Sequence, residues 1–387
     1  MRLTVPVEGV RRPAWAEISA SALRHNLSVM RAVCADAAVC AVVKANGYGH
    51  GAVTAAREFA DAGAAGLAVA IVDEGVELRD AGISAPILLL AETPDDAVQD
   101  ALISTLTLTV GSIAGARAAA QAAAELGGRH RVHLKVDTGM HRMGVLPHDL
   151  AEVVATLKSV PNIQVEGFYT HFPVAESAHA ADRSFSASQL ALFDGLLSAA
   201  RRDGLEPRVV HTANSAAALS MPESRRDMAR VGLALYGYLP DASLAGALSS
   251  RGLELRPAMS LRARVTAVRD LEAGERPSYG RRRALPDAAR VATVPFGYAD
   301  GYPRRLFDAG ATVLVHGRPR PLAGVVTMDQ LVIDCDGDDV RPGDVVTLLG
   351  RDGDAVIDAE TWATWSDTIT WEVLCGVGAR VPRVTVP

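Results

Sequence analysis

The sequence alternates between two patterns from Ala14 to about Pro240. Short β-branched runs are each followed by a longer alanine- and leucine-rich stretch with helical periodicity. The runs that predict strands are Val39–Lys44, Gly66–Ala70, Ile87–Ala91, Thr105–Val110, Val132–Asp137, Val165–His171, Arg208–Thr212 and Ala229–Leu233. The stretches that predict helices include Ser21–Val33, Ile113–Leu126, Pro147–Ser159 and Ser188–Arg202. About eight such βα units close into a TIM-like (β/α)8 barrel. A doubly wound open sheet is the alternative, although no GxGxxG fingerprint follows the first strand.

After about Leu244 the helical pattern almost disappears, and short alternating runs separated by turns replace it. These runs predict strands at Ala258–Val268, Val291–Phe296, Thr312–Val315, Gly324–Thr327, Leu331–Asp334 and Asp344–Leu348. One helical stretch, Asp358–Trp365, interrupts them, and Leu3–Val7 is expected to add a strand. The predicted fold class is therefore α/β. It has a barrel domain at residues 14–245 and a mostly β C-terminal domain at residues 246–387, joined by residues 1–13.

Charge and cysteine content exclude several classes of protein. The net charge of −6 argues against nucleic-acid binding, which favours a basic face. The four cysteines form no CxxC pair and no His/Cys cluster with zinc spacing, so we expect no metal and reduced thiols in a cytoplasmic protein. Met1–Pro13 lacks the apolar core of a signal peptide, and the longest apolar run, Ala62–Val72, is too short to span a membrane.

The first predicted strand ends in a lysine that is followed by a glycine-rich turn. The segment reads Ala-Val-Val-Lys-Ala-Asn-Gly-Tyr-Gly-His-Gly from Ala41 to Gly51, with the lysine at Lys44. Active sites of parallel α/β proteins are built at the carboxyl ends of strands. A lysine walled by apolar residues there loses its proton readily enough to form a Schiff base. The alternative is a lysine that merely extends into solvent from a strand end.

Polar residues also follow the later strands of the predicted barrel. They are Asp137, Thr138, Gly139 and Arg142 after the fifth strand, His171 at the end of the sixth, Asn214 and Ser215 after the seventh, and Gly232 after the eighth. Barrels commonly bind phosphate with the loops after strands seven and eight. A Schiff-base lysine and a phosphate pocket in one barrel indicate pyridoxal 5′-phosphate (PLP).

The chain resembles the alanine racemases, PLP enzymes of fold type III built from a barrel and a β domain. The similarity spans nearly the whole length and depends on an ordered set of short motifs. Besides the Lys44 segment, these are Ala14–Ile18, Lys135–Gly144, His211–Ser215, Arg230–Tyr238, Ser278–Gly280, Gly297–Gly301, Met328–Gln330 and Arg380–Arg383. Each motif alone is weak, but the ordered set is specific.

The resemblance implies two catalytic residues. Lys44 would hold PLP and act as one base, and Tyr279 would be the other base on the opposite face of the substrate Cα. Racemisation needs opposed bases, because the proton leaves from one face and returns to the other. In the family this tyrosine comes from the partner subunit, so the resemblance also implies a homodimer. Cationic neighbours would have to lower the pKa of Tyr279 for it to act at neutral pH.

The resemblance assigns further residues to the cofactor. Arg230 would face the PLP ring nitrogen and, being always charged, would disfavour a proton there. His211 would hold Arg230, and His171 would lie against the ring. Arg142 would contact the PLP phenolic oxygen and help to place the substrate carboxylate. The family often carbamylates the lysine that matches Lys135.

The remaining matches concern the phosphate, the substrate carboxylate and the gate to the site. Tyr48, Asn214, Ser215, Gly232 and Leu233 match the phosphate-binding group. Met328 would offer its backbone N–H to the substrate carboxylate from the partner subunit, Tyr298 matches the aromatic at the entry gate, and Asp329 is expected to support the site. The chain departs from the family at Trp371, where a tyrosine is usual. Loss of one hydrogen bond to a phosphate costs about 1.5–3 kcal/mol. We therefore expect weaker PLP retention, a changed gate, or both.

Three functions compete on the sequence alone. The leading one is an alanine racemase that supplies D-alanine for the bacterial cell wall. The second keeps the fold and both bases but acts on serine or a larger amino acid, for which Trp371 is the motive. The third is a non-catalytic PLP carrier, against which the Tyr279 motif argues, because a carrier needs no second base.

Overall fold

The computed structural model describes residues 12–387, which fall into two compact units. The barrel unit comprises Ala22–Gly47 and Ala52–Arg256. The β unit comprises Tyr48–Gly51, Pro257–Pro387 and residues 12–21. The strand predicted at Leu3–Val7 lies outside the described residues, and the predicted domain boundary at residue 245 stays a prediction. Within residues 12–387 none of the helices has the length and apolar composition needed to cross a membrane.

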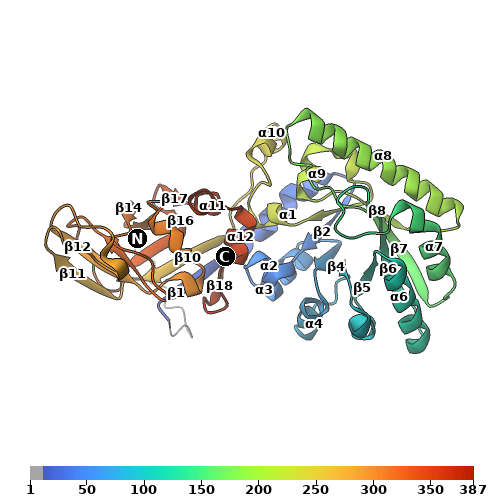
Figure 1. Cartoon of the computed structure of the whole chain (residues 1–387), viewed down its shortest axis with the longest axis horizontal. Coiled ribbons are helices and arrows are strands. Elements are labelled where there is room, and N and C mark those ends of the chain that lie inside the picture. The colour runs from blue at the N-terminus through green and yellow to red at the C-terminus, as the bar shows by residue number, and fades with distance from the viewer. Residues whose placement is uncertain (1–11) are drawn as a thin grey trace. The chain divides into compact units, whose positions relative to one another are not determined.

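Eight parallel strands form the centre of the barrel unit (Figure 1). They are β2 (Ala38–Val42), β3 (Gly66–Val69), β4 (Ile87–Glu92), β5 (Thr107–Val110), β6 (His130–Lys135), β7 (Ile163–Tyr169), β8 (Val209–His211) and β9 (Met228–Val231). Their order is β8-β7-β6-β5-β4-β3-β2-β9, so β8 and β9 are the two edges. Two backbone hydrogen bonds connect these edges, from Asp227 N–H to Val210 O and from Arg230 N–H to Ala213 O, each 3.0 Å long. The predicted barrel is therefore confirmed in a nearly closed form.

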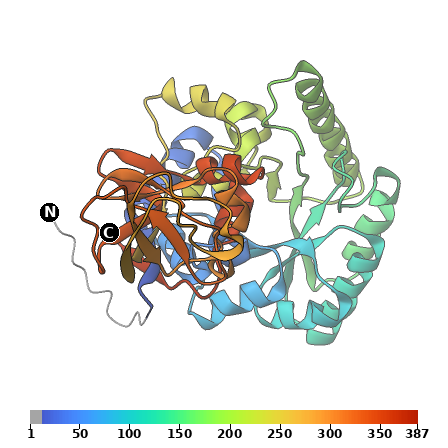
Figure 2. The ribbon, with the colours of Figure 1, turned by 60° about the vertical axis from the view of Figure 1, so that its left-hand side comes forward.

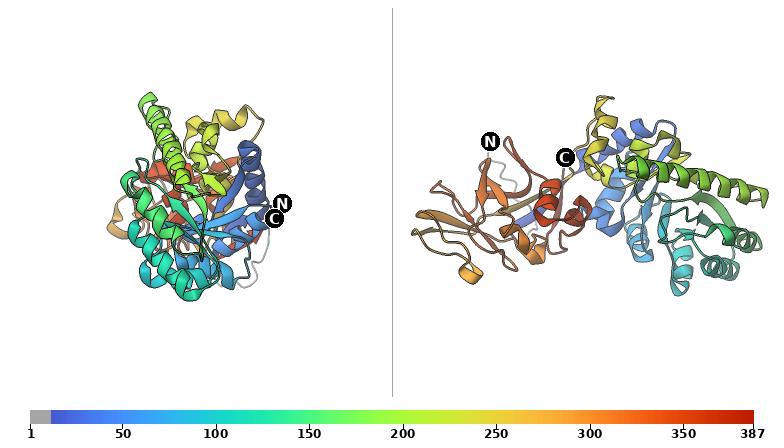
Figure 3. Two further views of the ribbon diagram at one scale, coloured as in Figure 1. Left: turned by 90° about the vertical axis from the view of Figure 1, so that its right-hand side faces the viewer. Right: turned by 45° about the horizontal axis from the view of Figure 1, so that its top comes forward.

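Helices lie around the outside of these strands (Figure 3, left). They are α1 (Ala20–Cys34), α3 (Ala52–Asp61), α4 (Val72–Asp80), α5 (Val98–Ile103), α6 (Ile113–Leu126), α7 (Leu150–Lys158), α8 (Ala180–Arg202), α9 (Ser215–Ser220) and α10 (Ala245–Ser249). Helix α6 has the predicted bounds, because the Ser112 hydroxyl accepts a hydrogen bond from Gly115 N–H at its start and the alanines of one face are buried. Helix α8, the long green helix in Figure 2, begins eight residues before the predicted Ser188.

The β unit contains two sheets. The larger has the order β14-β13-β16-β10-β1-β18 with β17 beside β16, and the smaller has the order β11-β12-β15. The strands are β1 (Ala14–Ser19), β10 (Met259–Arg264), β11 (Ala267–Leu271), β12 (Ala289–Val294), β13 (Thr312–Val315), β14 (Arg318–Pro321), β15 (Leu331–Asp334), β16 (Val345–Asp352), β17 (Ala355–Ile357) and β18 (Arg383–Val386). Helices α11 (Ala359–Ser366) and α12 (Thr370–Cys375) complete the unit. The buried Trp362 of α11 packs edge-on against Tyr302 and donates its Nε1–H to Leu348 O.

Three predicted segments differ from the structure. The sequence pattern placed residues 14–19 with the barrel, whereas β1 pairs with β10 and β18. The single strand predicted at Ala258–Val268 is wrong, because the chain leaves one sheet after β10 and joins the other at β11. The strand predicted at Gly324–Thr327 is also wrong. There the backbone of Gly324 lies so close to Pro277 that a Cβ on Gly324 would sit 2.4 Å from Pro277 O.

Candidate active site

Lys44 is followed by one turn of left-handed backbone. Strand β2 ends at Val42, and Lys44 opens the short segment α2 (Lys44–Tyr48). Inside it Ala45, Asn46 and Gly47 have φ values of 52°, 54° and 61°. This conformation costs about 1–2 kcal/mol for each residue that carries a Cβ. Hydrogen bonds hold it, from Ala45 N–H to the Glu74 carboxylate and from Ala52 N–H to the Asn46 side-chain oxygen. Such strain is typical of functional sites.

Lys135 ends strand β6 and is buried among cationic groups. Burial, followed by the positive charges of Arg230 and Arg142, lowers the pKa of Lys135 to about 8, and Lys44 contributes to the same effect. The ammonium lies 5.7 Å from the centre of the Tyr169 ring. Within the described chain, Lys135 Nζ makes no hydrogen bond or ion pair. The structure thus brings Lys44, Lys135, Arg142 and Arg230 into one electrostatic neighbourhood, with Arg142 exposed on its loop.

Arg230 on β9 is buried, and its two terminal nitrogens bind the ends of strands β7 and β8. Nη1 donates to His211 Nδ1 at 2.8 Å and lies 3.3 Å from His211 O. Nη2 contacts Thr170 O at 2.8 Å, His171 Nδ1 at 3.1 Å and Thr212 O at 3.1 Å. Among residues 12–387 the Arg230 Nε–H has no hydrogen-bond partner. Hydrogen bonds from Nη1 and Nη2 therefore hold Arg230 in one position, while its Nε–H remains available as a charged donor.

Both histidines that contact Arg230 are neutral. Burial, and then the positive charge of Arg230, hold the pKa of His171 and of His211 well below the usual value for histidine. The His211 ring also stacks on Tyr169, with 4.6 Å between ring centres and 11° between ring planes. Burial raises the pKa of Tyr169 to about 12, so its hydroxyl stays protonated. This hydroxyl lies 2.7 Å from that of Thr109. Because the His171, His211 and Tyr169 rings are all neutral, the positive charge of this group of side chains stays on Arg230.

The predicted phosphate residues of the barrel unit also lie together. Gly232 N–H donates to the Ser215 hydroxyl at 2.9 Å, although the two residues follow different strands. Asn214 precedes α9, and its side-chain oxygen accepts a hydrogen bond from Ala217 N–H. Leu233 opens the short helix η4 (Leu233–Tyr236) directly after Gly232. The Ser215 hydroxyl and the backbone at Gly232 thus meet where the resemblance places the phosphate.

Three predicted site residues stand exposed on adjoining loops of the β unit. Tyr279 is 73% exposed, Met328 52% and Tyr298 43%. The Tyr279 and Met328 loops touch, because the Ser278 hydroxyl donates to Val325 O. The Met328 and Tyr298 loops touch through a hydrogen bond from Tyr298 N–H to Thr327 O at 3.0 Å. The structure therefore carries these three residues on adjoining loops of the β unit.

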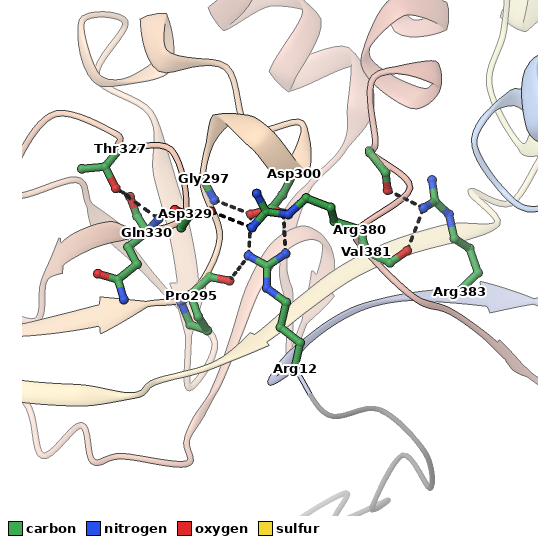
Figure 4. A network of polar contacts seen from close by, with 11 residues as sticks. Arg12, Pro295, Gly297, Asp300, Thr327, Asp329, Gln330, Arg380, Val381 and Arg383 are labelled. Carbon is green, nitrogen blue, oxygen red and sulfur yellow. Dashed lines mark hydrogen bonds and ion pairs between the residues drawn. The ribbon is translucent and has the colours of Figure 1, made fainter.

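A buried carboxylate holds two of these loops in place (Figure 4). Asp300 is fully buried in η7 (Tyr298–Asp300), and both of its oxygens bind the Arg12 guanidinium. It also accepts a hydrogen bond from Gly297 N–H and lies 3.3 Å from Arg380, which in turn binds Asp329 at 2.6 Å. We call Arg12, Asp300, Asp329 and Arg380 the Asp300 cluster. It connects the loop of Tyr298 with the loop of Met328.

Tyr48 and Trp371 belong to the β unit as well. Tyr48 is buried, and burial raises its pKa well above the usual value. The neighbouring Gly49 lies against α12, where a Cβ would come within 2.1 Å of Leu374 O. Trp371 is half-buried in the same helix. The segment of Tyr48 is therefore packed on the helix that carries the unusual tryptophan.

Sequence reasoning gave no role to several residues that the structure places beside the site. They are Glu166, His133, Tyr169, Thr170, Arg12 and Asp300. Of these, His133 carries a local signal, because it is a histidine between two apolar residues, Val132 and Leu134, in a strand whose last four residues are buried. Three consecutive arginines occupy positions 281–283, close after Tyr279 in the chain; Arg282 binds Asp308, and Arg283 donates a hydrogen bond to Leu322 O.

Comparison with known proteins agrees with this geometry. The family model described as the N-terminal domain of alanine racemase matches residues 18–240, and the C-terminal domain model matches residues 258–385. The chain belongs to the alanine racemase family. It is 40% identical to the alanine racemase of Carboxydothermus hydrogenoformans over 97% of this chain and 100% of that relative.

Solved structures of alanine racemases and one related racemase share the fold. The alanine racemase from D-cycloserine-producing Streptomyces lavendulae superposes with a TM-score of 0.91, at 38% identity over 98% of both chains. The histidine racemase from Leuconostoc mesenteroides subsp. sake superposes with a TM-score of 0.88, at 30% identity over 97% of this chain and 99% of that one. The family assignment made from sequence motifs is confirmed.

Proposed function

We propose that this alanine racemase family member interconverts L- and D-alanine with PLP, as a cytoplasmic homodimer that supplies D-alanine for peptidoglycan. The observation that carries the proposal is the cationic cluster of the barrel unit. Arg230 is held by carbonyls and neutral imidazoles, and its Nε–H is left without a partner among the described residues. A pyridine nitrogen is an acceptor that fits this donor.

The residues present fit the cofactor at each of its polar groups. Arg230 would bind the ring nitrogen, Arg142 the phenolic oxygen, the Ser215 hydroxyl and the Leu233 N–H the phosphate, and Lys44 the aldehyde carbon. When bound, PLP supplies an electron-withdrawing ring that stabilises negative charge at the substrate Cα. Because a guanidinium does not give up its proton, Arg230 keeps that ring unprotonated, which limits the lifetime of the charge and disfavours transamination.

The chain's own residues then move the proton and place the substrate. Lys44 takes or returns the Cα proton on one face, and Tyr279 does so on the other. Arg142 and the Met328 N–H orient the carboxylate, and Tyr298 narrows the access. The exposure of Tyr279, Met328 and Tyr298 supports a homodimer, because large apolar side chains held on structured loops are suited to cover by a second subunit.

The first experiment incubates the purified protein and PLP with L-alanine in D2O. Exchange of the α-proton is followed by NMR and formation of D-alanine by chiral chromatography. Exchange together with D-alanine is the expected result, and Lys44→Ala should abolish both. Exchange without D-alanine would contradict the two-base proposal, and no exchange with alanine would contradict the substrate.

A second candidate is racemisation of a different amino acid. Trp371 stands where the family usually has tyrosine, and a protein of this fold is named a histidine racemase. Kinetics with alanine, serine and histidine, for the wild type and Trp371→Tyr, separate the two candidates. The alanine proposal predicts that alanine has the highest kcat/KM in both proteins.

A further inference from the structure

A line of polar side chains runs outward from Arg230 through the barrel wall. It passes from Arg230 to His211, then to His133 on β6, and ends at Glu166 on β7. His133 Nδ1 lies 2.8 Å from His211 Nε2. Glu166 Oε2 lies 3.8 Å from His133 Nε2, which is too long for a direct hydrogen bond, so it acts on that ring as a nearby negative charge. We call these four residues the imidazole chain.

Arg230, at one end of the imidazole chain, determines which ring nitrogen of each histidine carries the proton. A guanidinium has only donors, so His211 Nδ1 accepts from Arg230. Neutral His211 then carries its proton on Nε2 and donates it to His133 Nδ1. Neutral His133 carries its own proton on Nε2, which faces Glu166. Burial lowers the pKa of His133, as it does that of His211, so neither ring competes with Arg230 for positive charge.

The barrel is built to admit the His133 ring. Gly167 is the β7 residue directly opposite His133 in the strand pair. A Cβ at position 167 would lie 2.3 Å from His133 Nδ1 and 2.4 Å from its Cγ. Any larger residue there would displace the ring from His211. The glycine therefore keeps clear the space in which the hydrogen bond between the two histidines forms.

We propose that His133, with Glu166 behind it, is a positioning residue for racemisation. It accepts the Nε2 proton of His211, fixes that ring as the Nε2–H tautomer, and so holds Arg230 with its Nε–H at one place. The role of Arg230 toward the cofactor rests on the proposed function, whereas the tautomer and the hydrogen bond belong to the protein alone. Without the acceptor on His133, the buried His211 N–H loses its partner and the ring is free to turn away from Arg230.

The first test is a measurement on the wild-type protein without substrate. With 15N-labelled histidine, NMR should show His211 protonated on Nε2 and not on Nδ1, with a scalar coupling between His211 Nε2 and His133 Nδ1 across the hydrogen bond. A proton on His211 Nδ1, or absence of the coupling, overturns the proposal. This readout does not depend on the reaction, so it remains decisive even if the protein racemises no alanine.

The second test compares two replacements of His133 in the PLP-loaded enzyme. His133→Asn keeps an acceptor near the position of Nδ1, whereas His133→Leu keeps a similar volume and removes it. The kcat should fall about tenfold or more in the leucine variant and by less than about threefold in the asparagine variant, with KM changed little in both. Equal kcat values in the two variants would show that His133 only fills space, and would overturn the proposal.

The matched control is His130→Leu. His130 lies on the same strand, but its Nε2 contacts Gly127 O and it takes no part in the imidazole chain. The kcat of the His130→Leu variant should stay at the wild-type value. If His133→Leu fails to fold, the variant Glu166→Gln tests the imidazole chain, because it removes the negative charge beside His133. It should lower kcat about two- to fivefold, whereas Glu152→Gln, which removes a carboxylate of a surface ion pair with Arg117, should not.

Discussion

In the barrel unit Arg230 and His211 are buried, His171 is half-buried, and Arg230 binds both histidines, whereas in the β unit Tyr279, Tyr298 and Met328 stand exposed on loops. The first group is oriented by hydrogen bonds between its own members. The second is oriented through the backbone of its loops, two of which the Asp300 cluster connects. The barrel unit thus holds its charged and polar groups in fixed positions, which is electrostatic preorganisation. The β unit instead presents exposed side chains that are suited to contact a second protein surface.

The largest effect should come from removing the Tyr279 hydroxyl. Tyr279→Phe should lower kcat for alanine about 10²–10⁴-fold, the usual contribution of a general acid or base. Exchange of the α-proton in D2O should persist for one enantiomer, because Lys44 still acts on its own face. Since Tyr279 is 73% exposed, the free energy of unfolding should change by less than about 0.5 kcal/mol. A variant that exchanges and racemises both enantiomers at the wild-type rate would remove Tyr279 from the mechanism.

The next effect tests how the exposed loops are held. Asp300→Asn removes the charge that binds Arg12 and approaches Arg380, and leaves both cations without it. We expect a loss of about 2–4 kcal/mol in the free energy of unfolding, since removing one partner of a buried ion pair is costly. The loss is limited because both arginines are partly exposed and water can solvate them. Thermal and urea unfolding measure it.

The matched control for this change is Asp308→Asn. Asp308 binds Arg282 at 2.6 Å, but both side chains are about half exposed. Its unfolding free energy should therefore change by less than about 1 kcal/mol. Equal losses in the two variants would mean that the Asp300 cluster stabilises the β unit no more than a surface ion pair does.

The two regions also differ in how far the sequence predicts them. The bounds of α6 follow from the Ser112 cap and an alanine face, which are local signals. The residues at barrel strand ends, from Lys44 to Gly232, were found by their place in a repeating pattern. The Asp300 cluster could not be found in this way, because Arg12 and Asp300 are 288 residues apart and no local sequence pattern pairs them. For the same reason the apolar run at Gly324–Thr327 suggested a strand, although a long-range backbone contact makes it a loop.

A smaller effect concerns the charge of Lys135. A pKa of about 8, against 10.5 for an ordinary lysine, gives a few hundredfold more neutral amine near pH 7. A neutral amine adds to the carbon of CO2 and releases a proton, which gives the carbamate. At fixed CO2 pressure, carbamylation should therefore increase as the pH rises from 7 to about 8.5.

Labelled carbon dioxide and 13C NMR measure this modification. The chain has only three lysines, Lys44, Lys135 and Lys158, so few signals compete. The carbamate signal should disappear in Lys135→Gln. A signal that is absent at pH 8.5 in the wild type, or that survives in the variant, would contradict the assignment to Lys135.

The smallest effect compares two fully buried tyrosines, one in each unit. Within the described residues the Tyr302 hydroxyl of the β unit is buried without a hydrogen-bond partner, whereas Tyr236 of the barrel unit donates its hydroxyl to Val42 O at 3.0 Å. Tyr302→Phe should raise the free energy of unfolding by about 1 kcal/mol, because it removes a polar group that folding leaves unsatisfied. Tyr236→Phe should lower it by about 1 kcal/mol, because Val42 O then loses a donor. Urea midpoints measured side by side give both values. Shifts of the same sign would show that the β unit satisfies its interior polar groups as fully as the barrel unit does.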